Sequence, residues 1–230
     1  MLTLETLVLQ QDDFRLTADW AVAAGERVAL IGPSGAGKST LLMALAGFFA
    51  AKEGRILWQG RDLAGVSPGD RPLTILFQDQ NLFPHLTLAQ NLGLGVSPTL
   101  RLTPAQTEQV ETALTRVGLA GMGGRKPGQL SGGQQGRAAL ARALLRARPV
   151  LLLDEPFAAL GPALKAEMLE LLDEVATSTG AAVLMVTHDP SDAKRFAGKT
   201  VLVADGVAQT PVATAELFAN PPQALRDYLG

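Results

Sequence analysis

The sequence is short of several kinds of residue, and each shortage excludes a class of function. It contains no cysteine, which excludes disulfides, thiolate metal sites and cysteine nucleophiles. Aromatic residues make up only 5% of the chain, too few for a platform on which single-stranded nucleic acid stacks. The 20 basic and 22 acidic residues leave a net charge of −2, so bulk charge does not favour nucleic-acid binding either.

Long hydrophobic runs are also missing. A helix that spans a bilayer needs roughly 20 nearly continuous apolar residues. The best run, residues 41–51, is shorter and contains Gly47. The first ten residues carry Glu5 and no basic stretch before an apolar one, which is not the pattern of a secretory signal. We therefore expect a cytoplasmic chain that reaches a membrane only by docking onto a partner.

The residues that are present indicate an α/β fold. Short apolar runs alternate with helical patterns, which is typical of a largely parallel central sheet. Several of these runs are continuously apolar, as strands that are buried on both faces are. The predicted strands are residues 28–31, 75–77, 150–153, 183–187 and 201–204, and residues 2–31 as a whole have a β pattern.

Three helices have clear sequence signals. One begins with Thr103, Pro104 and Gln106, a capping box with proline at the first helical position. Another follows a glycine-rich turn, and a third carries leucine, methionine and valine at helical spacing. The predicted helices cover residues 38–47, 104–117 and 162–177.

The middle of the chain has a different composition from its two ends. From about residue 78 to residue 129 it is rich in glycine, proline, asparagine and threonine and contains no strand run. We predict that residues 78–148 form a helical subdomain. It is inserted between residues 1–77 and 149–230, which together form the core of a single domain over residues 1–230.

The sharpest motif is the P-loop pattern GPSGAGKS at residues 32–39. It follows a predicted strand and opens a predicted helix, and all its fixed positions match, so an ordinary glycine-rich turn is a poor alternative. Its glycines allow a tight loop whose backbone N–H groups stabilise phosphate oxygens. Lys38 can reach the β- and γ-phosphates of a nucleotide, and the Ser39 hydroxyl can ligate Mg²⁺. The predicted nucleotide-binding residues are Gly32, Pro33, Ser34, Gly35, Ala36, Gly37, Lys38, Ser39 and Thr40.

A second motif is the acidic pair that ends the apolar run VLLL. In P-loop proteins an acid at the tip of a neighbouring strand holds the magnesium ion, so we assign that role to Asp154. Glu155 is then placed to orient or deprotonate the attacking water. By itself the pair could equally be an acidic turn, because Pro156 follows at once. Beside a complete P-loop, the catalytic interpretation is favoured.

The third motif is LSGGQ at residues 130–134. A P-loop, LSGGQ and LLLDEP in this order resemble the ATP-binding cassette (ABC) family, of which LSGGQ is the signature. The resemblance implies an ATPase with a P-loop core, an N-terminal antiparallel β subdomain and a helical insert. It also implies a head-to-tail dimer, in which the signature of one copy faces the γ-phosphate of the ATP bound to the other. The signature residues that contact ATP are then Ser131, Gly132, Gly133 and Gln134.

Two more residues gain roles from the same resemblance. Gln78 follows the run TILF and resembles the family's Q-loop glutamine, which contacts Mg²⁺ or water. His188 follows VLMVT and resembles the switch histidine near the γ-phosphate. Taken alone, each would be a polar residue at the end of a strand. The resemblance implies catalytic roles for Lys38, Gln78, Glu155 and His188, and metal contacts for Ser39, Gln78 and Asp154.

The chain departs from the family pattern at three places. Gln10 or Gln11 stands where the family has an aromatic residue that stacks on adenine, with Phe14 nearby. Gly161 replaces the aspartate of the family's Ser-Ala-Leu-Asp, a change that could weaken a contact across the dimer. Gly136 replaces a glutamine in the helix after the signature, at a cost of about 1 kcal/mol relative to alanine.

The helix after the signature also carries a group of arginines. They could form an anion site, but a basic face in solvent is the favoured interpretation, because arginine is seldom fully buried. These residues are Arg137, Arg142, Arg146 and Arg148.

The resemblance further implies partners for the chain. Because no membrane helix is expected, the pore has to be a separate integral membrane permease, as in bacterial importers, supplied by a periplasmic solute-binding protein. The chain is then expected at the cytoplasmic face of the inner membrane, with a second copy of itself and without nucleic acid. Candidate permease contacts are Leu82, Phe83, Pro84 and Leu86. Packing within the insert's own core is favoured for Leu86, and for Phe83 the two interpretations are equally favoured.

Within the family, the amino-acid sequences of two segments most resemble those of the thiamine-import ATPases. These segments are IGPSGAGKSTLLMALAGF and LFQDQNLFPHLTLAQNLGLG. They imply MgATP-driven uptake of thiamine or thiamine pyrophosphate, with ATPases for iron, polyamines or molybdate as the close alternative. ABC ATPases of DNA repair or translation are less favoured, because the sequence has no long coiled coil and no second cassette. A P-loop kinase would have no use for LSGGQ.

Overall fold

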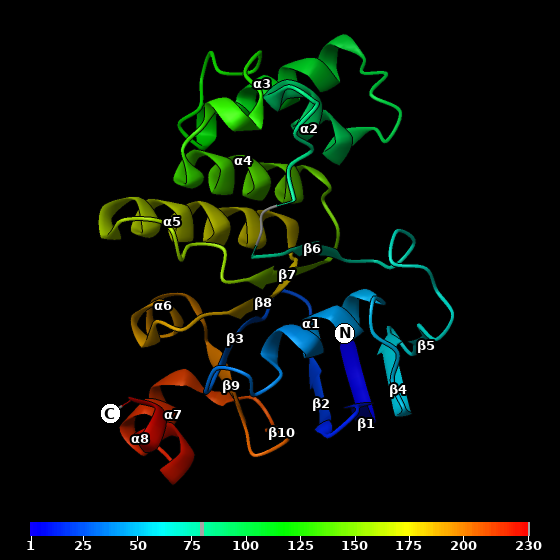
Figure 1. The fold of residues 1–230 in the computed structure, drawn as a ribbon, viewed down its shortest axis with the longest axis vertical. Coiled ribbons are helices and arrows are strands. Elements are labelled where there is room, and N and C mark those ends of the chain that lie inside the picture. Colours follow the sequence, from blue (N-terminus) through cyan, green and yellow to red (C-terminus); the bar gives the residue numbers. More distant parts are fainter. Residues whose placement is uncertain (79–80, 230) are drawn as a thin grey trace.

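A single sheet runs through the structure, a computed structural model that describes residues 1–78 and 81–229. The sheet lies toward one end of the molecule, and a group of helices forms the other end (Figure 1). Among the described residues, no helix is long and apolar enough to cross a membrane. The strands are β1 (Leu2–Gln11), β2 (Phe14–Val22), β3 (Arg27–Ile31), β4 (Glu53–Trp58), β5 (Arg61–Asp62), β6 (Thr74–Leu76), β7 (Val150–Asp154), β8 (Ala182–Val186), β9 (Lys199–Ala204), β10 (Val207–Ala208) and β11 (Val212–Ala213).

The parallel half of the sheet has the order β9-β3-β8-β7-β6. Each of its strands was predicted to within a residue or two, because each is a continuous apolar run. In β7, Val150 and Leu152 pack into one hydrophobic core, whereas Leu151 and Leu153 pack into another. This alternation follows from the two-residue period of a strand, and it confirms the α/β fold with a sheet buried on both faces.

The antiparallel half of the sheet has the order β5-β4-β1-β2, and β10 joins it to β9. β1 and β2 fall within the predicted β region, but β4 was not predicted. Its first three residues, Glu53, Gly54 and Arg55, are exposed, so only the last three residues, 56–58, give the strand an apolar signal. Such a short signal does not distinguish a strand from a loop.

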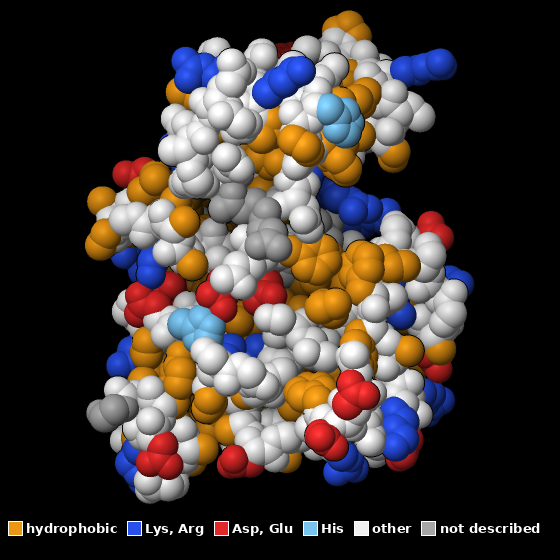
Figure 2. All heavy atoms as spheres, in the orientation of Figure 1, with side chains coloured by type: hydrophobic (Ala, Val, Ile, Leu, Met, Phe, Trp, Pro, Cys, Tyr) orange, Lys and Arg blue, Asp and Glu red, His pale blue; other side chains and the backbone are white. Residues whose placement is uncertain are grey.

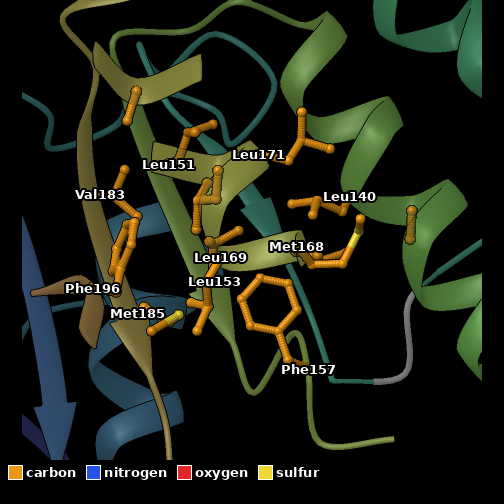
Figure 3. Packing of buried hydrophobic residues seen from close by; sticks show 14 of the residues in the cluster. Leu140, Leu151, Leu153, Phe157, Met168, Leu169, Leu171, Val183, Met185 and Phe196 are labelled. Carbon is orange, nitrogen blue, oxygen red and sulfur yellow. The ribbon is translucent and has the colours of Figure 1, made fainter. Parts of the chain in front are cut away.

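Helices cover both faces of the sheet. α1 packs with β1 and β2, whereas α4 and α5 pack on the other face, where Leu140 and Met168 lie close to Leu153 and Phe157 (Figure 3). The predicted helices are all present, and the capping box of α3 is confirmed. The helices are α1 (Lys38–Ala46), α2 (Leu88–Val96), α3 (Pro104–Arg116), the 3₁₀ turn η1 (Pro127–Gln129), α4 (Gly132–Leu145), α5 (Pro162–Thr179), α6 (Pro190–Phe196), α7 (Thr214–Ala219) and α8 (Gln223–Leu229).

The segment between β6 and β7 is helical in its described part, with α2, α3 and α4 packed together. α2 approaches α4 closely, since a Cβ on Gly95 would lie 2.6 Å from the carbonyl oxygen of Arg142. Buried Asn91 ties the preceding loop to α2, because its side chain accepts from the N–H and donates to the carbonyl of Phe83. The division of the chain near residues 78 and 148 remains a prediction.

One buried arginine holds the end of the helix that follows the P-loop. The Arg71 guanidinium donates to the carbonyl oxygens of Ala44 and Leu45 in the last turn of α1, at 3.0 and 2.7 Å. It also donates to the carbonyls of Leu63 and Val66, at 3.0 and 3.2 Å. A cation at this end also complements the helix dipole, so Arg71 fixes the direction of α1.

Replacing Arg71 with methionine should destabilise the protein by about 2–3 kcal/mol. The methionine keeps most of the apolar volume but leaves buried carbonyls without a donor. Urea unfolding should show a lower midpoint for Arg71→Met, with little change for the control Arg61→Met at an exposed position. Equal midpoints for the two variants would contradict the capping role.

Candidate active site

The P-loop joins β3 to α1 and has the backbone that an anion site needs. Gly32, Gly35 and Gly37 all have positive φ, at 145°, 78° and 100°. A Cβ on Gly32 would lie 2.0 Å from the carbonyl oxygen of Val203, so only glycine fits there. No side chain caps the N-terminus of α1 at Gly37, which leaves the first N–H groups of the helix available to a phosphate.

Lys38 lies inside this loop and is only 5% exposed. Its ammonium donates to the carbonyl oxygens of Gly32 and Pro33, at 2.7 and 2.8 Å. Burial lowers the pKa of Lys38, and the carboxylates of Glu155 and Asp154 partly offset that shift. The loop therefore combines a cation with a ring of backbone donors, which is a site for a polyanion.

Asp154 ends β7 and is buried beside the P-loop. Burial raises the pKa of Asp154, whereas the Ser39 hydroxyl and the Lys38 charge lower it. Its Oδ1 atom has no hydrogen-bond partner among the described residues. A buried carboxylate oxygen without a partner, beside a serine hydroxyl, is a donor set that Mg²⁺ accepts.

Glu155 and His188 meet at the tips of β7 and β8. The Nε2 atom of His188 lies 2.6 Å from Oε1 of Glu155. Glu155 is held there by its own backbone, since its N–H donates to Val186 at 3.1 Å and its φ is 49°, an unusual value for a residue other than glycine. Acidic and histidine side chains gather in the middle of this face, below the helical end (Figure 2).

One cavity of about 450 Å³ brings most of the predicted site residues together. The P-loop, the carboxylate of Glu155 and the side chains of Gln78 and His188 all line it. This arrangement joins a phosphate-binding loop to a carboxylate that could act as a general base. The lining residues are Phe14, Ser34, Gly35, Gly37, Lys38, Ser39, Thr40, Gln78, Glu155 and His188.

The signature residues lie elsewhere on the chain, at the N-terminus of α4. Ser131 caps that helix, with its hydroxyl accepting from Gln134 N–H at 3.3 Å and Gln134 Oε1 accepting from Ser131 N–H at 3.0 Å. Ser131 and Gly132 are exposed. None of the residues 131–134 is among the described residues that line the P-loop cavity. Within one copy of the chain, the signature residues therefore lie apart from the P-loop cavity.

Phe14, rather than Gln10 or Gln11, is the side chain that accompanies the P-loop. It begins β2 and lines the cavity, and a Cβ on Gly37 would lie 2.7 Å from its ring. Gln10 points elsewhere, since its amide oxygen accepts from Lys52 Nζ at 2.7 Å. The sequence contained this aromatic residue, but its place beside the loop depends on how the β1–β2 hairpin folds.

The expectation of a solvated basic face on α4 is wrong for two of its arginines. Arg137 donates to the carbonyl oxygen of Val117 at 3.1 Å. The Arg142 guanidinium lies 5.7 Å from the centre of the Phe83 ring, and burial lowers the pKa of Arg142. The rest of the helical insert covers these side chains, which a helical pattern read in isolation does not reveal.

Sequence reasoning missed a charged cluster behind the histidine. The Lys165 ammonium lies 2.7 Å from Asp189 and 3.2 Å from Asp192, and Asp192 also accepts from Thr187 at 3.0 Å. The hydrogen bond from Lys165 lowers the pKa of Asp189 to about 2. The cluster fixes the loop that carries His188 against α5. The pairing spans more than 20 residues, so no local pattern signals it.

Known proteins resemble this chain over most or all of its length. Residues 17–158 match the family model described as ABC transporter. The chain is 70% identical to the thiamine import ATP-binding protein ThiQ of Cereibacter sphaeroides and 55% identical to that of a Ruegeria species, in both cases over the whole of both chains. A dimeric structure of the ATP-binding cassette MJ0796 bound to ADP and Pi is 27% identical, with a TM-score of 0.83 over 93% of this chain and 99% of that chain.

Replacing Phe14 with alanine should raise the Kd for ATP about tenfold. Base–aromatic stacking contributes about 1–3 kcal/mol per base, and the Phe14 ring is the aromatic surface at this end of the cavity. Calorimetric titration of the variants would measure this change. Phe14→Tyr, which keeps a ring, and Gln11→Ala should both bind ATP as the unaltered chain does. If Gln11→Ala lost more affinity for ATP than Phe14→Ala, the assignment of Phe14 as the stacking residue would be contradicted.

Proposed function

Because this chain belongs to the ABC transporter family, we propose that it is the ATP-hydrolysing subunit of a bacterial importer for thiamine or thiamine pyrophosphate. The observation that carries the choice of solute is the 70% identity, over the full length of both chains, to a thiamine import ATP-binding protein. The candidate active site supplies the residues for ATP hydrolysis.

In the proposed reaction, the P-loop amides and Lys38 bind the phosphates of ATP. Ser39 and Asp154, with Gln78 at the edge of the cavity, would hold Mg²⁺. Their oxygens fit that ion, since Asp154 carries a buried carboxylate oxygen with no partner among the described residues. The ion supplies charge that offsets the phosphates in the transition state.

Hydrolysis in this proposal depends on the pair at the tips of β7 and β8. The Glu155 carboxylate accepts a proton from the attacking water. His188, in contact with Glu155 at 2.6 Å, holds the γ-phosphate end of the site, and Gln78 orients the water. Most of the rate enhancement then comes from positioning and electrostatics, as in phosphoryl transfer generally.

The site is complete only with a second copy of the chain. Ser131, Gly132, Gly133 and Gln134 form an exposed helix N-terminus that lies apart from the P-loop cavity of the same chain. Packed against the P-loop of a partner, this N-terminus would face the γ-phosphate. The dimeric arrangement of the MJ0796 cassette supports this pairing. Gly161 lies in the loop where the family has an aspartate, so the contact across the dimer loses a carboxylate.

Exposed aromatic side chains offer a surface for the permease. Phe83 and Phe48 are 46% and 53% exposed, and Phe48 contacts Phe77 with ring centres 5.5 Å apart. Exposed aromatic side chains of this kind suit a protein interface. We place the chain at the cytoplasmic face of the inner membrane, bound through Leu82, Phe83 and Pro84 to a permease that a periplasmic solute-binding protein supplies. Leu86 is half-buried, so it is left out of this contact. No contact with nucleic acid is proposed.

Uptake of labelled thiamine tests the proposal in cells from which the gene has been deleted. The unaltered gene should restore uptake, and Glu155→Gln should not, because loss of a general base lowers hydrolysis by roughly 10²–10⁴-fold. Glu167→Gln, at an exposed position on α5, is the matched control and should restore uptake. If the deletion cells took up thiamine normally but lost uptake of iron, polyamines or molybdate, the choice of solute would be overturned. Full uptake with Glu155→Gln would overturn the proposed base.

A further inference from the structure

The last helix of the chain reaches the loop that carries His188. Leu225 of α8 is fully buried in the core that also contains α4 and α5, and Tyr228 packs against the same core. One turn after that anchor, the Tyr228 hydroxyl donates to the backbone carbonyl of His188 at 3.0 Å. The same oxygen lies 3.4 Å from the Nδ1 atom of the imidazole.

The imidazole of His188 is therefore contacted at both of its nitrogens. Nε2 lies 2.6 Å from the carboxylate of Glu155, and Nδ1 faces the phenol oxygen of Tyr228. The phenol has a single proton, which goes to the nearer acceptor, the backbone carbonyl. The same oxygen stays in contact with Nδ1 and so limits rotation of the ring. A hydrogen-bond partner at one ring nitrogen commonly holds the ring of a functional histidine in this way.

Lys165 and Tyr228 both hold the His188 loop, but they act on different parts of the histidine. Lys165 holds the residue after the histidine, since its ammonium pairs with Asp189, and so fixes the backbone. Tyr228 reaches the ring of His188, a side chain that is 39% exposed and has Glu155 as its partner at the other nitrogen. Burial and the nearby carboxylates of Glu155 and Asp189 raise the pKa of Tyr228, so the phenol keeps its proton at neutral pH.

We propose that Tyr228 is a positioning residue for ATP hydrolysis. Its phenol fixes the rotation of the His188 imidazole and so keeps Nε2 directed at Glu155 and the γ-phosphate end of the site. Tyr228 touches neither the P-loop nor Glu155 in the contacts of the described residues. Its effect on the reaction passes through His188, and the proposal therefore rests on the proposed roles of Glu155 and His188.

Steady-state ATPase assays of the full chain with Tyr228→Phe test this role. The variant keeps the ring and its packing and loses only the hydroxyl. We expect kcat to fall by roughly threefold to tenfold, the rate equivalent of one hydrogen bond, with an unchanged KM for ATP. Asp227→Asn, next to it on α8, is the matched control and should keep the original kcat. An unchanged kcat for Tyr228→Phe overturns the proposal.

A double-mutant cycle shows whether the effect passes through the histidine. In a His188→Ala background, adding Tyr228→Phe should not lower kcat further, because the ring to be positioned is gone. An additional loss of the same size in that background overturns the positioning role. If His188→Ala by itself keeps full activity, the proposed role of His188 fails, and this inference fails with it. If Tyr228→Phe keeps full activity while His188→Ala is impaired, the role of Tyr228 fails and the proposed function stands.

The imidazole nitrogens give a direct readout that a merely structural role would not change. The chain has two histidines, so nitrogen NMR spectra contain two imidazoles, and His85 serves as the internal reference. Tyr228→Phe should shift the Nδ1 resonance of His188 and leave both resonances of His85 in place. Unchanged His188 resonances would contradict the contact on which the proposal depends.

Discussion

The buried ammonium of Lys38 is the feature on which the rest of the site depends. Backbone carbonyls of the P-loop bind this ammonium, and the carboxylates of Asp154 and Glu155, at the end of β7, lie near it. A buried cation needs such compensation, because desolvation of a charge costs several kcal/mol. The carbonyls of Gly32 and Pro33 supply that compensation. No side chain caps the N-terminus of α1, so this cation lies beside helix N–H groups that remain available to a phosphate.

The order of the strands brings the two halves of this site together. β3 carries the P-loop and lies beside β8, which carries His188, and β8 lies beside β7, which carries Asp154 and Glu155. All three strands are parallel, so their carboxyl ends meet at one edge of the sheet. The helix after the P-loop is held at its other end by Arg71, and the loop with His188 is held by Lys165. The side chains that we propose to act in hydrolysis therefore extend from the ends of packed strands.

Local patterns predicted the parallel strands and most of the candidate site, and long-range contacts account for most of what was missed. The P-loop and the acidic pair were found because each is a short motif tied to one strand end. The family roles of Gln78 and His188 fell on residues that line the same cavity. Phe14 was seen but not assigned, since its position depends on a hairpin. Tyr228 lies 40 residues from the histidine it contacts, so no spacing rule could identify it. The arginines of α4 were misplaced because an isolated helical pattern contains no information on which helices cover it.

The central claim is that the nucleotide site is shared between two copies of the chain. Sedimentation of the full chain with Glu155→Gln in MgATP tests it most directly, because a chain that binds ATP without hydrolysing it should accumulate in the closed state. We predict a dimer with ATP and a monomer without it. Adding Ser131→Arg should return the protein to a monomer, since the arginine would block the helix N-terminus that faces the partner's γ-phosphate. A dimer that persists with Ser131→Arg, or a monomer that binds ATP with full affinity in both variants, would contradict the shared site.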